Sequence, residues 1–329
     1  MKMIVFGTRP EIIKLYPLIK ALPDGYLVWT GQHDKLGNQL LKEFNITPNE
    51  DLKVMVERQS LTSLTIKLHQ TLSDVYKRKQ PELVIVQGDT TSAMVASLEA
   101  FYHKIPVAHI EAGLRTRNIY SPFPEEVNRR IITQIAKYNF TPTIEASSNV
   151  ELEGWGEIIK VGQTGIDTLL EFSKKIKVKK KKKLLITLHR RENFDKIQSI
   201  ADKIIRFLIY NPEWEAVMPI HPNPVIRKAI HESNLGSVVK LIEPLGYLDM
   251  IREMKESSLI ITDSGGIQEE APSLGIPVLV ARKLTERPEG IKEGFAKFLD
   301  SEIKIFKVPR KKNPYGDGKA TERILEWLV

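Results

Sequence analysis

Short runs of apolar and β-branched residues recur along the chain, and each run ends in a polar or glycine-containing turn. The runs are nearly continuous in apolar residues, which is typical of strands that are buried on both faces of a parallel sheet. They predict strands at Ile4–Phe6, Tyr26–Trp29, Leu83–Val86, Val107–Ile110, Tyr138–Phe140, Leu184–Leu188, Ala216–Ile220, Val238–Ile242, Leu259–Thr262 and Pro277–Val280.

Segments with apolar residues at helical spacing lie between these strands. They predict helices at Ile12–Leu22, Leu64–Tyr76, Ala93–Tyr102, Val127–Ile135 and Ile197–Leu208, and a last helix at Ala320–Leu328. Regular alternation of strand and helix predicts an α/β doubly wound fold. Because the pattern runs through twice, we expect two Rossmann-like domains, with a ligand in the cleft between them at the carboxyl ends of both sheets.

A lysine-rich run at residues 177–183 separates the two halves. It holds six lysines, so the net charge of +8 would be +2 without it. Such a run could bind nucleic acid, but it contains no aromatic residue that would stack on bases. We therefore expect a solvated tether that its own charge repulsion keeps extended.

The composition narrows the class of protein further. The chain has no cysteine, which excludes a disulfide framework and a thiolate metal site, and no apolar run reaches the roughly 18 residues of a membrane span. It lacks a G-x-G-x-x-G turn after a strand, a G-x-x-x-x-G-K-[ST] loop and an H-E-x-x-H pair. We therefore expect no dinucleotide cofactor, no P-loop and no metal, and a cytoplasmic location.

The first predicted strand leads directly into Gly7-Thr8-Arg9-Pro10-Glu11. Thr8 and Glu11 have the spacing of a helix capping box, and Pro10 suits the first helical turn, where no N–H is required. A purely structural cap needs no arginine. Arg9 at a strand end beside a helix N-terminus instead indicates a phosphate contact.

A glycine turn, Ser264-Gly265-Gly266, follows the predicted strand Leu259–Thr262 and opens a helix. Glycines let the backbone approach a ligand closely and Ser264 adds a hydroxyl, so the turn suits a pyrophosphate. Glu270, about one turn further on, could accept both hydroxyls of a ribose. The alternative is an ordinary turn followed by solvated glutamates.

Acidic residues follow predicted strands in the first half. Asp89 could be a helix cap and Glu125 could favour a helix dipole, but Glu111 precedes Ala-Gly and has no capping role. Three acids that converge on one cleft form a constellation for general acid–base chemistry. In the second half, His189 ends a strand and precedes two arginines, which suits a loop that faces phosphate.

Eight motifs, in order along the chain, resemble the non-hydrolysing UDP-N-acetylglucosamine 2-epimerases. They are Gly7–Glu11, Gly88–Thr91, His109–Thr116, Pro124–Arg129, His189–Glu192, Asp263–Glu270, Thr285–Glu289 and Asn313–Gly318. The resemblance covers essentially the whole chain and implies the GT-B architecture. It implies a first domain of residues 1–165, a UDP-binding domain of residues 166–315 that includes the lysine-rich run, and a helix within 316–329 that crosses back to the first domain.

The resemblance also implies the roles of single residues. It matches the family's catalytic positions with Asp89, Glu111, Glu125, His189 and Lys14, and its UDP-contacting positions with Arg9, His189, Ser264, Gly265, Gly266 and Glu270. It matches effector-site positions with Gln32, His33 and Arg58, although Asp34 and Lys35 depart from the family's Gln-His-Arg segment. It further implies a homodimer that uses no cofactor and supplies UDP-N-acetylmannosamine for polysaccharides.

The implied reaction inverts C2 of the sugar. A C2 proton beside an acetamido group is hardly acidic, and oxidation needs a redox cofactor. Elimination of UDP as a carboxylate removes the C2 proton would give 2-acetamidoglucal, and UDP would add back with a proton delivered to the opposite face. The alternatives are a GT-B glycosyltransferase, a hydrolysing epimerase, an epimerase of a 2,3-diacetamido uronic acid nucleotide and a nucleic-acid-binding protein.

Overall fold

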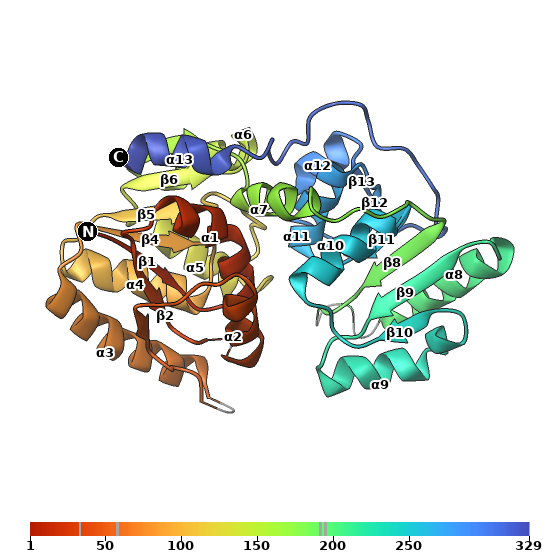
Figure 1. Ribbon diagram of the computed structural model, residues 1–329, viewed down its shortest axis with the longest axis horizontal. Helices are drawn as coiled ribbons and strands as arrows, with labels where there is room; N and C mark the ends of the chain where they lie inside the picture. The colour runs from red at the N-terminus through yellow and green to blue at the C-terminus, as the bar shows by residue number, and fades with distance from the viewer. Residues whose placement is uncertain (33, 57–58, 191–192, 194–195, 329) are drawn as a thin grey trace. The chain divides into compact units, whose positions relative to one another are not determined.

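The computed structural model describes residues 1–32, 34–56, 59–190, 193 and 196–328. The chain divides into two compact units, the first made of Met1–Thr168 with Gly318–Val329 and the second of Leu169–Asp317 (Figure 1). Each unit has its own parallel sheet with helices between successive strands, as an α/β doubly wound fold requires. No helix in the described ranges combines the length and the apolar character that crossing a membrane demands.

The sheet of the first unit has the strand order β3-β2-β1-β4-β5-β6-β7, and every neighbouring pair is parallel. Its strands are β1 (Lys2–Phe6), β2 (Tyr26–Trp29), β3 (Glu50–Asp51), β4 (Leu83–Gln87), β5 (Val107–Ile110), β6 (Tyr138–Thr141) and β7 (Glu157–Lys160). The order reverses between β1 and β4. In open α/β sheets, ligands bind beside the carboxyl ends of the strands at such a reversal.

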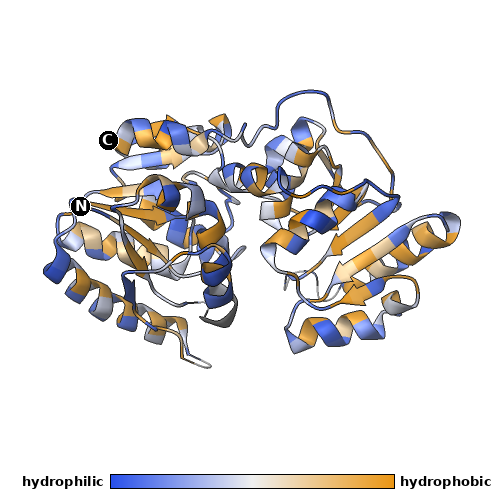
Figure 2. Ribbon diagram, in the orientation of Figure 1, coloured by the Kyte–Doolittle hydropathy of each residue, from blue (hydrophilic) through white to orange (hydrophobic). Residues whose placement is uncertain are grey.

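The helices of the first unit are α1 (Arg9–Ala21), α2 (Asp34–Glu43), α3 (Leu61–Lys79), α4 (Thr91–Tyr102), α5 (Glu125–Thr133), α6 (Ile144–Glu153), the first half of α7 (Thr164–Ser173) and α13 (Ala320–Leu328). Buried side chains of α3, α4 and α5 pack against β1, β4 and β5 in one apolar core. Figure 2 shows the central strands in orange and the helices in mixed colours, as expected where only one face of a helix is buried.

The sheet of the second unit has the order β10-β9-β8-β11-β12-β13, again with parallel pairs, and it reverses between β8 and β11. Its elements are β8 (Lys183–Thr187), α8 (Ile197–Tyr210), β9 (Glu215–Pro219), α9 (Pro224–Glu232), β10 (Lys240–Ile242), α10 (Tyr247–Glu256), β11 (Leu259–Thr262), α11 (Gly265–Glu270), β12 (Val278–Val280), α12 (Pro288–Lys292) and β13 (Ala296–Phe298). Short 3-10 turns lie at Leu235–Ser237 and Ala271–Leu274.

The strands predicted from apolar runs are confirmed, each to within two residues at its ends. Two strands differ by two residues: β1 begins at Lys2 and not at Ile4, and the strand predicted at Val238–Ile242 begins only at Lys240, after a 3-10 turn at Leu235–Ser237. The prediction did not include three strands at sheet edges, β7 (Glu157–Lys160), β13 (Ala296–Phe298) and β3, which is only the acidic pair Glu50–Asp51. A strand of two polar residues at a sheet edge carries no apolar signal.

The expectation of a solvated lysine tether is wrong at the end of the lysine-rich run. Lys183 is buried and opens β8, and its ammonium binds the carboxylates of Glu253 at 2.5 Å and Glu256 at 3.0 Å. Lys182 pairs with Glu213 at 3.1 Å. Acidic partners within the second unit therefore neutralise part of the charge that the sequence concentrates in the run.

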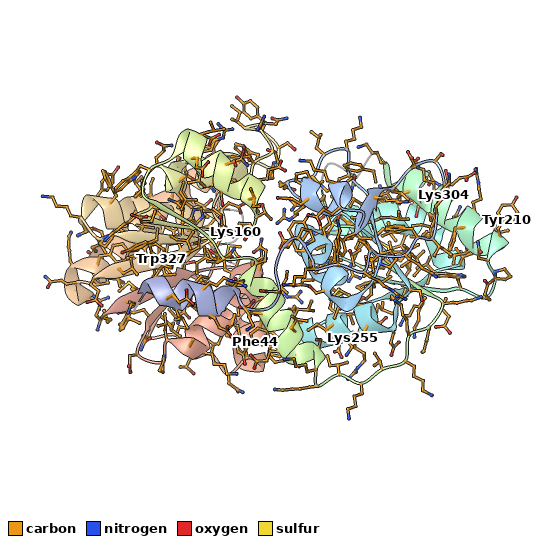
Figure 3. The ribbon with its side chains drawn as sticks, turned by 90° about the horizontal axis from the view of Figure 1, so that it is seen from above. Phe44, Lys160, Tyr210, Lys255, Lys304 and Trp327 are labelled. Atoms are coloured by element: carbon orange, nitrogen blue, oxygen red, sulfur yellow. The ribbon has the colours of Figure 1, made fainter. Side chains whose placement is uncertain are left out.

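Helix α7 is anchored at both of its ends. In the first unit, Asp167 accepts the backbone N–H groups of Ala320 and Thr321, at 3.2 and 2.7 Å, and so caps α13. In the second unit, the ammonium of Lys255 (labelled in Figure 3) donates to the carbonyls of Ser173 at 2.7 Å and of Ile176. The helix and the segment after it are thus held by polar contacts as well as by packing.

Candidate active site

The carboxyl end of β5 turns sharply at Glu111. This residue has a φ of +68°, in the left-handed region that residues other than glycine seldom adopt. Gly113, two positions on, has a φ of +87°, and a Cβ there would meet the carbonyl oxygen of Ala146 at 2.0 Å. The turn brings the Glu111 carboxylate to the edge of the sheet, where it is 5% exposed.

Three side chains from separate elements hold the Glu111 carboxylate. The Lys14 ammonium on α1 donates to Oε1 at 2.5 Å and to Oε2 at 2.6 Å. The amide of Gln163 donates to Oε1 at 2.8 Å, and the amide of Gln87, the last residue of β4, donates to Oε2. A cation and two N–H donors all favour the ionised form of a carboxyl group.

Asp89 lies in the turn after β4 and is not the cap of the following helix. Thr90 has that role, because its hydroxyl accepts the N–H of Ala93 at 3.0 Å. The Asp89 carboxylate instead binds the guanidinium of Arg129 on α5, and the Asp89 carbonyl accepts the amide of Asn128 at 2.9 Å. Helix α5 is thereby fixed against the turn that carries Asp89.

Glu125 and Glu126 begin α5 but have different surroundings. Glu126 is fully buried, and its carboxylate accepts the backbone N–H groups of Thr116 and Arg117 at 3.0 and 3.2 Å. It therefore holds the preceding loop in place. Glu125 is the half-buried member of the pair, at the start of the helix that is tied to Asp89.

The turn between β1 and α1 places Arg9 at the first position of the helix, with Pro10 after it. The predicted capping box is only partly formed, since the side chain of Thr8 makes no capping bond. The Glu11 carboxyl accepts the Gly7 N–H at 3.0 Å and the Thr90 hydroxyl at 2.9 Å. Burial raises the pKa of Glu11 to about 7, although these hydrogen bonds act to lower it.

In the second unit, His189 follows β8 and is oriented by Asp263, which follows β11. The Asp263 carboxylate lies 3.1 Å from Nδ1 of His189 and accepts the backbone N–H groups of His189 and Arg190. It also accepts the amide of Asn193 at 2.9 Å. Burial alone would raise the pKa of Asp263, but His189 and these donors hold it below its usual range. Nε2 of His189 is left on the other side of the ring.

The glycine turn after β11 rests on a buried ion-pair network. The guanidinium of Arg287 binds Glu269 at 2.6 Å and Glu286 at 3.3 Å, and a Cβ on Gly265 would meet it at 2.5–2.9 Å. A Cβ on Gly266 would have no neighbour closer than 4.0 Å. Ser264 precedes α11 and Glu270 ends it, half-exposed. The Thr285–Glu289 motif thus supports the turn.

The structure also assigns a supporting role to the Asn313–Gly318 motif. The Tyr315 hydroxyl accepts the N–H of Gly290 and donates to the carbonyl of Arg287, both at 2.8 Å. The amide of Asn313 donates to the carbonyl of Glu269 at 2.8 Å. This motif therefore fixes the backbone on either side of the ion-pair network.

Of the predicted effector positions, Gln32 is described, and His33 and Arg58 lie outside the described residues, as do Arg191 and Glu192 of the His189 motif. The Gln32 side-chain oxygen accepts the N–H and the hydroxyl of Ser92 at 3.1 and 2.8 Å. Gln32 thus supports the start of α4.

Sequence reasoning did not select Gln87, Gln163 or Asp263 as site residues. Gln87 and Asp263 were detectable in principle, since each is a polar residue at the carboxyl end of an apolar run. Gln163 has no such signal. It precedes α7, and only the folded chain brings it to Glu111, 52 positions away.

Comparison with known proteins gives matches over nearly the whole chain. A family model described as UDP-N-acetylglucosamine 2-epimerase matches residues 23–329. A Campylobacter jejuni protein named UDP-N-acetylglucosamine 2-epimerase is 41% identical over an alignment of 370 residues, gaps included. The alignment covers 99% of this chain and 97% of that protein.

Two crystal structures have similar folds. UDP-GlcNAc 2-epimerase from Neisseria meningitidis, bound to UDP-GlcNAc, has a TM-score of 0.91 at 40% identity and covers 100% of this chain and 99% of that chain. UDP-GlcNAc 2-epimerase from Methanocaldococcus jannaschii, in complex with UDP-GlcNAc and UDP, has a TM-score of 0.84 at 34% identity, with the same coverage of 100% and 99%. Both similarities extend over the two units and over the turns that carry the predicted site residues.

Proposed function

Because the chain belongs to the UDP-N-acetylglucosamine 2-epimerase family, we propose that it interconverts UDP-N-acetylglucosamine and UDP-N-acetylmannosamine without net hydrolysis. The observation that carries the proposal is the buried Glu111 carboxylate, ion-paired with Lys14 at the carboxyl edge of the first sheet. A carboxylate held in this way has the position and the charge of a general base.

We assign the proton transfers at C2 to Glu111 and to a second acid, Asp89 or Glu125. In the forward direction a carboxylate takes the C2 proton, and the electrons of that C–H bond form the C1–C2 double bond. The C1–O bond breaks and its electron pair leaves with UDP, giving 2-acetamidoglucal. In the return step UDP oxygen attacks C1 as a proton is delivered to the other face of C2.

We assign the UDP moiety to Arg9, His189, Ser264–Gly266 and Glu270. Elimination places negative charge on the departing diphosphate, so cationic and N–H donors that are fixed beforehand lower the barrier. Asp263 fixes the His189 ring through Nδ1 and leaves Nε2 for a phosphate oxygen. The two glycines after Ser264 let backbone N–H groups approach the diphosphate, and the Glu270 carboxylate suits the ribose hydroxyls.

The test is incubation of the pure protein with UDP-N-acetylglucosamine alone in D2O, followed by NMR. We expect deuterium at C2 and a UDP-N-acetylmannosamine product, with no free sugar. Inert substrate would contradict epimerisation and favour a glycosyltransferase that requires an acceptor. Release of free N-acetylmannosamine together with UDP would indicate a hydrolysing enzyme instead.

The proposal includes a cytoplasmic homodimer, as the family resemblance implies. Size-exclusion chromatography with light scattering tests the oligomeric state. A mass of twice the 37.5 kDa chain supports the dimer, and a mass equal to that of one chain contradicts it.

A further inference from the structure

The Glu111 carboxylate is surrounded by N–H donors on both of its oxygens. Oε1 accepts from Lys14 and Gln163, and Oε2 from Lys14 and Gln87. An ionised carboxylate offers about four lone-pair positions, so Glu111 can take the C2 proton only at a position that Lys14 has left. Lys14 is the one charged group among these three donors, and the two glutamines are neutral amides that neither give up nor take a proton in ordinary chemistry.

We propose that Gln163 is a positioning residue for the reaction, whose side-chain amide fixes Oε1 of Glu111 for proton transfer at C2. The inference rests on the proposed function and assigns one more residue to the same site. Gln163 is 1% exposed, and its amide nitrogen lies 2.8 Å from Oε1. A buried amide of this kind is costly to the fold unless it is hydrogen-bonded, so its contact with Glu111 has a structural reason to persist.

Gln163 is itself held firmly, as positioning requires. It directly precedes α7, whose Thr168 hydroxyl donates to the carbonyl of Ile13 at 2.7 Å. Ile13 is the neighbour of Lys14, so α7 is fastened to the part of α1 that supplies the cation. Asp167 fastens the same turn of α7 to the N-terminus of α13.

The backbone of Glu111 gives a reason why its side chain needs support. A glutamate at a φ of +68° is in a sparsely populated conformation that persists only when its surroundings determine it. Lys14 has a long and flexible side chain that an incoming diphosphate could attract. The amides of Gln163 and Gln87 would then keep both oxygens of Glu111 in place.

The contact should also influence the proton affinity of Glu111. Two titratable groups interact with it among the described residues: Lys14 on α1, which binds both oxygens, and His109 on β5, which lies close enough to feel its charge. Burial lowers the pKa of His109 to about 4, so this ring is neutral near pH 7 and donates from Nε2 to the Gly88 carbonyl. Removal of the Gln163 donor leaves these groups in place and destabilises only the ionised form of Glu111.

The experiment compares the wild type with Gln163→Leu and Gln163→Glu. C2 deuterium exchange is measured as kcat and KM across pH 5 to 9, and the Glu111 side-chain carboxyl is titrated by NMR in protein labelled with [δ-13C]glutamate. Glu111→Gln assigns the resonance. The matched control is Gln198→Leu, which removes an amide–carboxylate bond of the same 2.8 Å length to the exposed Asp202.

We expect Gln163→Leu to lower kcat at least tenfold with KM changed less than threefold. The acid limb of kcat/KM and the Glu111 titration should both move to higher pH by about one unit. A pKa shift of about that size corresponds to the loss of one hydrogen bond to a charged group. Gln163→Glu places a second carboxyl beside Oε1 and should move both further in the same direction. Gln198→Leu should move neither.

Unchanged acid limbs and an unchanged Glu111 titration in both variants would overturn the proposal, even if the activity fell, because a merely structural role has that signature. If Gln163→Leu does not fold, the nearly isosteric Gln163→Glu decides. If the wild type itself shows no exchange at C2, the proposed function fails, and the NMR titration still decides whether Gln163 controls Glu111.

Discussion

The ammonium of Lys14 contacts both carboxylate oxygens of Glu111, at 2.5 and 2.6 Å, although the two residues are 97 positions apart in the chain. Their side chains are 13% and 5% exposed. Loss of one member of such a buried pair leaves the other charge uncompensated, which costs more than the pair itself contributes. Glu111→Gln keeps the shape of the side chain but leaves the Lys14 ammonium uncompensated.

Glu111→Gln should reduce turnover by about 100-fold or more and leave UDP affinity within about twofold, because the change removes a base and not a nucleotide contact. Turnover is measured by C2 deuterium exchange and UDP affinity by calorimetry. Glu151→Gln on α6 is the control, since Glu151 is exposed. Wild-type turnover in Glu111→Gln would remove this residue from the mechanism.

Asp263→Asn should weaken the second unit and its nucleotide contacts together. Asp263 is fully buried and accepts N–H donors from His189, Arg190 and Asn193. The NH2 group of an asparagine would face these N–H groups and could not accept their hydrogen bonds. We expect a loss of about 2–4 kcal/mol of stability and at least tenfold weaker UDP binding. Asp202→Asn, at an exposed carboxylate that accepts one amide at 2.8 Å, should change neither.

The Asp263 carboxylate should also make the stability of the protein depend on pH. The native state holds the pKa of Asp263 below its usual value of 3.8. Its contribution is therefore present above about pH 4 and is lost as the pH falls through the native pKa. In thermal unfolding from pH 7 to pH 3, the melting temperature of the wild type should fall toward that of Asp263→Asn. A difference that stays constant over this range would contradict the assignment.

Glu11→Gln should change the pH dependence of stability in the opposite sense. The unfolded chain releases this proton near pH 4.5 and the native chain near pH 7, so wild-type stability falls as the pH rises between these values. Glutamine stays neutral, so the free energy of unfolding of the variant should rise relative to that of the wild type, by up to about 3 kcal/mol over that pH range. If the melting temperatures of the wild type and of Glu11→Gln changed in parallel from pH 5 to pH 8, this prediction would be wrong.

Gly265→Ala and Gly266→Ala form a matched pair in the same turn. A Cβ at 265 would press on the Arg287 guanidinium at 2.5–2.9 Å, and Arg287 cannot move away without breaking its ion pairs. We expect Gly265→Ala to cost about 1–3 kcal/mol in ligand-free thermal unfolding. Gly266→Ala has open space and should be within about 0.5 kcal/mol of the wild type. Equal effects would refute the supporting role of Arg287.

Glu270→Ala should chiefly weaken UDP binding, by about 1.5–3 kcal/mol if its carboxylate accepts charged hydrogen bonds from ribose. Calorimetry with UDP measures the effect. Glu232→Ala, at an exposed carboxylate on α9, is the control. Unchanged UDP affinity in Glu270→Ala would exclude the ribose contact.

The strands and the order of elements were predictable from the sequence because a strand buried on both faces needs an unbroken apolar run, and Leu83–Gln87 or Leu259–Thr262 offers little else. Edge strands follow another rule. Glu50–Asp51 extends the first sheet through backbone hydrogen bonds alone, and no side-chain pattern records such bonds. The lysine-rich run misled for a related reason, since its neutralising glutamates come from α10 and from the turn before β9.

The candidate site was predictable only as polar residues at the ends of strands, such as Glu111 and His189. The contacts that define its chemistry were not, since they join elements distant in the chain. Gln163 meets Glu111 across 52 positions, and Asp263 meets His189 across 74. A capping spacing also proved ambiguous, because the Glu11 carboxyl bonds to Gly7 and to Thr90 of another turn.

Helix α13 belongs to the first unit but follows the whole of the second unit along the chain. A ribosome makes residues 169–317 before it makes the helix that Asp167 caps and whose Arg323 donates to the Val161 carbonyl at 2.8 Å. Domains generally form during synthesis from the N-terminal side. In this chain the second unit can therefore be complete before the first, and a nascent first unit keeps the docking place of α13 uncovered until translation has passed it.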